Sequence, residues 1–101
     1  MGSFVRVAAV TDLQPGQGKV VEAGGQQIAL FNCGGTFYAI DNTCLHRGGP
    51  LGEGLLEGTM VTCPWHAWTY DVTTGINLIN PNVCVKTYPV KVEGSNVHVD
   101  I

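Results

Sequence analysis

Short apolar segments separated by turn-forming residues run through this sequence, and this rhythm limits the fold more than any other feature. Gly24-Gly25 and Gly34-Gly35 each lie between two apolar segments, where glycine would supply the positive φ angles of a tight hairpin turn. Gly94-Ser95-Asn96 predicts a further hairpin near the C-terminus. No stretch of ten or more residues has helical periodicity, so the sequence predicts an all-β fold. The expected strands are Phe4–Val10, Lys19–Ala23, Ile28–Asn32, Thr36–Asp41, Thr59–Thr62, Trp68–Val72, Cys84–Tyr88, Val90–Glu93 and Val97–Ile101.

Length and composition fit one folded domain spanning residues 1–101. With 45% apolar and 13% charged residues, the chain is expected to fold rather than remain disordered. Its net charge of −3 comes without a basic stripe, which argues against nucleic acid and anionic membranes as partners. No apolar run is long enough to cross a membrane, and the N-terminal residues lack the pattern of a secretory signal. We therefore expect a soluble cytoplasmic protein in which at least some of the four cysteines bind metal.

Two short motifs offer thiolate and imidazole ligands. Cys44-Leu-His46 lies in the segment Asn42–Gly58, which is rich in glycine and is expected to be a loop too long for a plain connection. Cys63-Pro-Trp-His66 follows after sixteen intervening residues. Hairpin strands between the motifs would bring both loops to one end of a sheet, so the sequence predicts a metal centre there.

The same four residues are also compatible with a structural zinc site, because two cysteines and two histidines are a common zinc ligand set. Their spacing is not the usual spacing of a zinc finger, which argues against this alternative. The other two cysteines, Cys33 and Cys84, fall in or beside expected strands and are predicted to be small buried side chains.

The sequence around the motifs resembles the Rieske family. The resemblance lies in Cys44-Leu-His-Arg-Gly-Gly-Pro-Leu51, in Cys63-Pro-Trp-His-Ala-Trp-Thr-Tyr-Asp71 and in Thr74-Gly75. Asp12-Leu-Gln-Pro-Gly16 and Tyr88-Pro-Val-Lys-Val92 are also similar to that family, so the resemblance covers most of the chain.

This resemblance implies a Rieske-like antiparallel β-sandwich with a smaller cluster-binding subdomain of two loops, at about residues 42–83. It implies one Rieske-type [2Fe–2S] cluster, with Cys44 and Cys63 on one iron and His46 and His66 on the other. It also implies that the Tyr70 hydroxyl reaches a cluster cysteine and that Pro81 begins a third loop covering the cluster. Trp65 and Trp68 either pack in the core or shield the cluster; their positions favour shielding for Trp65 and the core for Trp68.

Differences from the family pattern indicate which kind of Rieske protein this chain resembles. Respiratory Rieske proteins carry a disulfide between two further loop cysteines, whose positions here hold Gly49 and Trp65. They also carry a serine that donates a hydrogen bond to the cluster, and that position here holds Trp68. The chain therefore resembles the Rieske ferredoxins of bacterial ring-hydroxylating dioxygenases, and the small subunits of some nitrite reductases are a close alternative.

The chain lacks the groups for oxygen or hydride chemistry. Outside the two motifs only His98 remains, so a mononuclear iron site with two histidines and a carboxylate cannot be built. Gly52–Glu57 begins like a dinucleotide-binding motif but has glutamate in place of the third glycine. We expect a monomeric electron carrier rather than an enzyme. Its expected partners are a flavin-dependent reductase and a terminal oxygenase.

Overall fold

A central strand with both faces buried organises this molecule. The computed structural model describes residues 4–43, 49–64 and 68–101. Its strands are β1 (Phe4–Ala9), β2 (Gly18–Ala23), β3 (Gln26–Cys33), β4 (Thr36–Asp41), β5 (Leu55–Glu57), β6 (Met60–Thr62), β7 (Thr69–Asp71), β8 (Thr87–Tyr88), β9 (Val90–Glu93) and β10 (Asn96–Asp100), with short 3-10 helices η1 (Val10–Asp12) and η2 (Leu51–Glu53). Among these residues no helix is long and apolar enough to cross a membrane.

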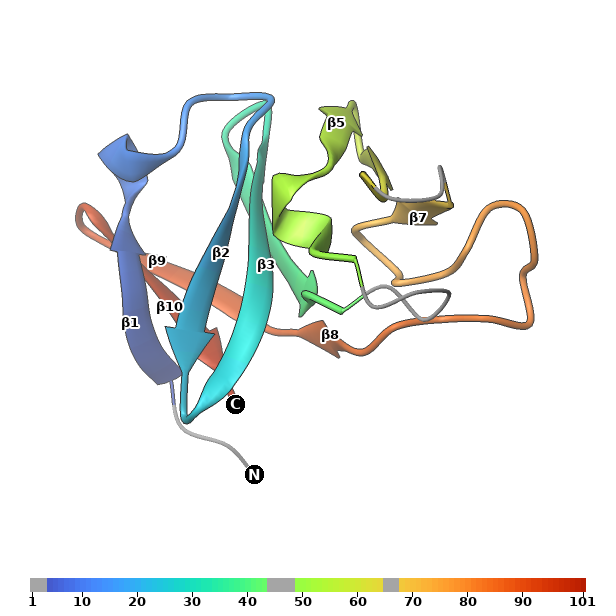
Figure 1. Ribbon diagram of the computed structural model, residues 1–101. Helices are drawn as coiled ribbons and strands as arrows, with labels where there is room; N and C mark the ends of the chain where they lie inside the picture. The colour runs from blue at the N-terminus through green and yellow to red at the C-terminus, as the bar shows by residue number, and fades with distance from the viewer. Residues whose placement is uncertain (1–3, 44–48, 65–67) are drawn as a thin grey trace.

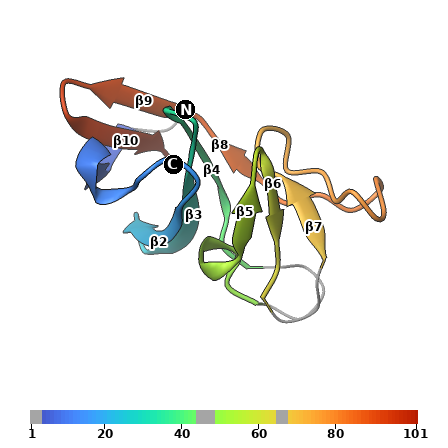
Figure 2. The same cartoon turned by 90° about the horizontal axis from the view of Figure 1, so that it is seen from above.

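The strands form three antiparallel sheets that lie one beside the next. The terminal sheet has the order β1-β10-β9, the central sheet β2-β3-β4-β8, and the small sheet β5-β6-β7. Figure 1 shows the central sheet between the other two, and Figure 2 shows the small sheet set apart from the terminal sheet. This arrangement confirms the predicted all-β sandwich with a smaller subdomain.

Alternation along β3 explains why the central sheet is covered on both sides. Ile28 and Leu30 belong to one buried cluster, which β10 completes with Val97 and Val99. Ala29 and Phe31 point to the opposite face and belong to a second buried cluster. All four of these β3 side chains are 0% exposed, as expected for a strand that is covered on both faces.

The glycine pairs form the predicted hairpin turns. Gly24 and Gly25 have φ angles of 58° and 79° between β2 and β3, and Gly34 and Gly35 have 64° and 100° between β3 and β4. Side chains other than glycine rarely adopt this region, so the pairs fix where each hairpin reverses.

Three stretches differ from the sequence-based expectation. The segment expected to be one loop, Asn42–Gly58, contains η2 and strand β5, which pairs with β6. Of Cys84–Tyr88 only the last two residues form a strand, because Cys84 makes just an isolated bridge to Ile76. Val10 begins η1 rather than ending β1.

The two cysteines outside the motifs also differ from each other. Cys33, at the end of β3, is half-buried against the second buried cluster, which contains Ala29 and Phe31. Cys84 is exposed, so its prediction as a buried side chain was wrong. Cys84 pairs only through an isolated bridge to Ile76 and lies outside the strands that the described residues form.

Candidate metal centre

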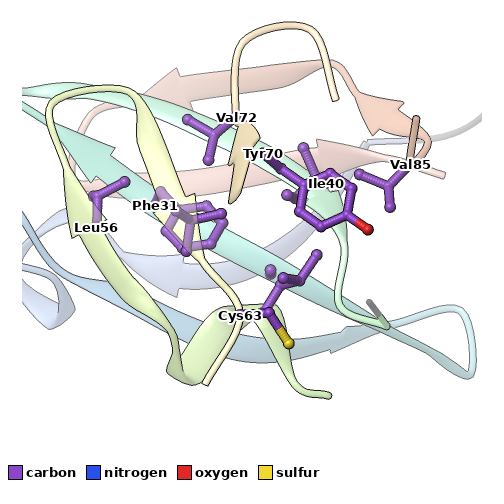
Figure 3. Close-up of a cluster of buried hydrophobic side chains, with 10 residues drawn as sticks. Phe31, Ile40, Leu56, Cys63, Tyr70, Val72 and Val85 are labelled. Atoms are coloured by element: carbon purple, nitrogen blue, oxygen red, sulfur yellow. The ribbon is translucent and has the colours of Figure 1, made fainter. Parts of the chain in front are cut away.

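The second motif begins at Cys63, directly after β6. The backbone N–H of Cys63 donates a hydrogen bond to the carbonyl oxygen of Trp68 at 2.7 Å. This bond closes the turn immediately before β7. Cys63 is only 2% exposed. Figure 3 shows its sulfur pointing away from the labelled apolar side chains, on the side where η2 lies.

The first motif lies in a segment whose two ends are paired. Thr43 and Pro50 form an isolated antiparallel bridge. The next residue, Leu51, donates its backbone N–H to the carbonyl oxygen of Asn42 at 2.6 Å and has a fully buried side chain. The segment that carries the first motif therefore leaves the sheets and returns to them at neighbouring positions.

Both loop bases meet in one buried cluster. Leu51, which ends the first loop, and Cys63, which begins the second, belong to the same cluster as Tyr70. A methyl group on Gly54 would lie 2.3 Å from the carbonyl oxygen of Thr62, so the residue that follows η2 contacts the end of β6 through a position that only glycine can fill. The described bases of the two loops, at Leu51 and Cys63, thus lie in one cluster beside the small sheet.

Tyr70 and the segment that contains Pro81 border the same region. Tyr70 in β7 is 0% exposed, and Figure 3 shows its ring beside Ile40 and Val85. Tyr70 also forms an isolated bridge with Asn77, whose side-chain oxygen accepts hydrogen bonds from Ile79 and Asn80 at 2.7 and 2.9 Å. These bonds shape the connection between β7 and β8.

The predicted site residues divide into described and undescribed positions. Cys63, Tyr70 and the exposed Pro81 are described, and Pro81 lies in a turn closed by the hydrogen bond from Val83 to Asn80 at 2.9 Å. The other four predicted residues, Cys44, His46, Trp65 and His66, lie outside the described residues.

Sequence reasoning missed two asparagines that fix loop ends, Asn42 and Asn77, which are 4% and 0% exposed. Asn77 has a local signal, because its side chain bonds to residues two and three positions later, whereas Asn42 bonds to residues nine and ten positions later and has none. Trp68 is half-buried against the core cluster, in line with its predicted core position.

The environment of Cys33 disfavours its thiolate form. Burial and, to a smaller extent, the negative charge of Asp71 raise the pKa of the Cys33 thiol. A raised pKa keeps this thiol protonated, whereas metal ligation requires the thiolate. Cys33 therefore fits a packing role.

This geometry fits a metal held between two loops. A buried cysteine directs its sulfur out of an apolar cluster, and the loop that carries the first motif ends in the same cluster at Leu51. Soft thiolate ligands suit iron–sulfur clusters and zinc. The fold and site define an all-β protein with a buried cysteine at the end of a strand of its small sheet, in a position that suits a metal ligand.

Comparison with known proteins identifies that class. The model of the Rieske [2Fe–2S] domain family matches residues 3–89. The ferredoxin component of a naphthalene 1,2-dioxygenase system from Pseudomonas aeruginosa is 36% identical over 99 residues, which cover 97% of this chain and 95% of that protein.

The folds of solved structures support the same family. One chain of a complex of reduced oxygenase and oxidised ferredoxin in carbazole 1,9a-dioxygenase has a TM-score of 0.88 at 33% identity, with 96% of this chain and 92% of that chain covered. A protein from Mycobacterium tuberculosis, described as the small subunit of an NADH-dependent nitrite reductase, has a TM-score of 0.92 at 27% identity, with 100% and 96% covered.

The chain therefore belongs to the Rieske [2Fe–2S] domain family, and its cofactor is one Rieske-type [2Fe–2S] cluster. Such a cluster supplies a centre that accepts and releases one electron at a time. The predictions of family, fold and cofactor are confirmed.

Proposed function

We propose that this chain is the ferredoxin component of a multicomponent oxygenase system. It receives single electrons from a flavin-containing NAD(P)H reductase and delivers them to a terminal oxygenase that hydroxylates aromatic rings. It does so as a monomeric domain of residues 1–101 in the cytoplasm. The observation that carries this proposal is the match to a dioxygenase ferredoxin component over 97% of this chain and 95% of that protein.

In this proposal Cys44 and Cys63 hold one iron, and His46 and His66 hold the other. Its structural support is Cys63, whose buried sulfur points out of the apolar cluster at the closed end of the β6–β7 hairpin. The cluster-binding part extends over about residues 42–83.

Metal analysis and spectroscopy test the ligand assignment. We expect two irons and two sulfides per chain, and a reduced EPR spectrum with an average g below that of clusters with four cysteine ligands. Cys63→Ser should abolish this signal, whereas Cys84→Ser is a matched control at an exposed cysteine and should retain it. One bound zinc and no visible absorption would refute the assignment.

The charge of the small sheet and its flanking segments supports a basic partner. Residues 49–64 and 68–85 contain Glu53, Glu57 and Asp71 but neither lysine nor arginine, although Arg47 precedes and Lys86 follows them in the sequence. Glu53 and Glu57 are exposed, and a negative surface steers an approaching positive one. We therefore expect the rate of electron transfer to the oxygenase to fall as ionic strength rises.

A pair of charge-removing variants tests this docking. Glu57→Gln should lower the transfer rate at low salt, whereas Glu22→Gln, at an exposed position on β2 in the central sheet, should leave it unchanged. Equal rates for the two variants would show that Glu57 does not face the partner.

The reduction potential of the cluster tests the assignment to oxygenase systems. Rieske potentials span about −150 to +300 mV, and hydrogen bonds to the cluster sulfurs raise them within this range. With Trp68 in place of a serine donor, we expect about −150 mV to somewhat below zero. A midpoint above about +100 mV at pH 7 would overturn the ferredoxin assignment.

A fixed subunit of a nitrite reductase is the second candidate. It is favoured by the TM-score of 0.92 over the whole chain to a protein described as such a subunit. Co-purification with a large reductase, unaffected by salt, would support this candidate over the mobile carrier.

A further inference from the structure

Asn42 joins the two ends of the first cluster loop. Its backbone carbonyl oxygen accepts the N–H of Leu51 at 2.6 Å, and its side-chain Oδ1 accepts the N–H of Gly52 at 2.8 Å. The Asn42 side chain is 4% exposed, and the accepting bonds lie inside the protein. Between these two ends, Thr43 and Pro50 form a bridge.

The far end of the loop is anchored on the central sheet. Leu51 is fully buried, and a methyl group on Gly52 would lie 2.8 Å from Val20 Cγ2 and 2.9 Å from the Val20 nitrogen. The η2 backbone therefore packs on β2 more closely than any residue larger than glycine would allow. Figure 1 shows η2 against the central sheet, between β3 and β5.

The near end of the loop is anchored on the same sheet. Asp41, which precedes Asn42, is the last residue of β4 and pairs with Ile28 of β3. The separation of the loop ends is therefore set by two strands of the central sheet and by the two hydrogen bonds that Asn42 accepts. Without the Asn42 side chain, the buried N–H of Gly52 would lose its acceptor, which is costly in the protein interior.

We propose that Asn42 is a positioning residue for the [2Fe–2S] cluster, which acts by fixing the ends of the loop that carries Cys44 and His46. This inference rests on the ligand assignment of the proposed function. Groups that orient metal ligands through hydrogen bonds affect metal affinity although they do not touch the metal. Asn42 fits this role because it is two residues from Cys44 and closes the loop on itself.

Asn32 provides a matched control within the same sheet. It is also 4% exposed, its Oδ1 accepts the N–H of Gly35 at 2.8 Å, and its carbonyl oxygen accepts the N–H of Gly16 at 2.8 Å. It lies in β3 four residues beyond Ile28, the residue that pairs with Asp41, and so about 13 Å further along the strand. The same substitution there removes an equivalent bond without touching the loop, and it also removes the bond that Asn32 Nδ2 donates to the carbonyl oxygen of Leu13 at 2.9 Å.

The experiment compares Asn42→Ala and Asn32→Ala as purified, cluster-containing proteins. The loss of visible absorption is followed after a chelator is added, and the EPR spectrum and reduction potential are measured. We expect Asn42→Ala to release iron about 10- to 100-fold faster than the wild type and to show altered g values, whereas Asn32→Ala should match the wild type. Asn42→Asp keeps an acceptor oxygen and should restore slow release.

Equal release rates and equal g values for Asn42→Ala and Asn32→Ala would overturn the proposal, even if both variants are less stable. If the alanine variants do not fold, Asn42→Ser and Asn32→Ser are compared in the same way, and equal rates and g values for this pair would likewise overturn it. A wild-type protein without a Rieske spectrum would refute the proposed function itself, so failures of the two proposals are distinguishable.

Discussion

Tyr70→Phe tests whether the Tyr70 hydroxyl donates to a cluster cysteine. The ring is 0% exposed and lies beside Ile40 and Val85, so phenylalanine should keep its packing. Because the position is closed to solvent, water cannot replace the lost hydroxyl. The substitution therefore removes one hydrogen-bond donor and little else.

The expected effect on the potential follows from the energy of one hydrogen bond. A donor to a thiolate sulfur stabilises the reduced cluster more, because the extra electron raises the negative charge on the sulfur. If the difference equals a typical net hydrogen bond of about 0.5–1.5 kcal/mol, a one-electron potential falls by about 20–60 mV.

The assay is a spectroscopic redox titration of wild-type and variant proteins. Tyr88→Phe is the matched control, since Tyr88 is also buried but its hydroxyl lies within hydrogen-bond distance of Asp41 and Gln26. We expect the potential of Tyr88→Phe to equal that of the wild type. A Tyr70→Phe potential equal to that of the wild type would refute the donor role and leave Tyr70 as a packing residue.

Three further substitutions test the cluster and the fold. Cys63→Ser should yield protein without the cluster and with a lower melting temperature by calorimetry, because metal binding contributes to folding, and equal stability would contradict this. Trp68→Ser introduces a hydroxyl donor and should raise the potential in a redox titration; an unchanged potential, with the hydroxyl shown in place, would assign the value to solvent exposure instead. Burial, then the hydrogen bond to Asp41 and the charge of Asp41, raise the pKa of Tyr88 to about 12. The unfolded chain loses this proton first above about pH 10, so the stability advantage of the wild type over Tyr88→Phe in urea titrations should shrink between about pH 10 and 12, and a constant advantage would argue against the raised pKa.

The sequence predicts well those elements that depend on local signals. Gly24 and Gly34 marked hairpins because a positive φ is a local requirement that glycine meets. Strand β5 was missed because the glycine-rich segment that contains it was interpreted as one loop, and its pairing with β6 depends on the turn at Gly58. The exposure of Cys84 could not be predicted, because it depends on whether a second strand covers that position.

The candidate metal site also contains residues that could be predicted from the sequence and residues that could not. Cys63 was predicted as a ligand from its motif, and this prediction is compatible with its buried place at the hairpin turn. The role of Asn42 could not be predicted, because its hydrogen-bond partners lie nine and ten residues later and reach it only when η2 packs on β2. Contacts of this kind follow from tertiary structure and leave no pattern in the local sequence.

The central sheet separates two buried clusters, one on each of its faces. Along β3, Ile28 and Leu30 pack toward the terminal sheet, whereas Ala29 and Phe31 pack toward the small sheet that carries Cys63. Leu51 and Cys63, at the bases of the two cluster loops, both belong to the second of these clusters. Substitutions in the cluster that contains Ile28 and Leu30 should therefore lower the stability of the whole chain. Substitutions in the cluster that contains Ala29 and Phe31 should also change the geometry of the metal ligands. A carrier gains from this separation because ligands held rigidly before and after reduction need little rearrangement when an electron enters or leaves.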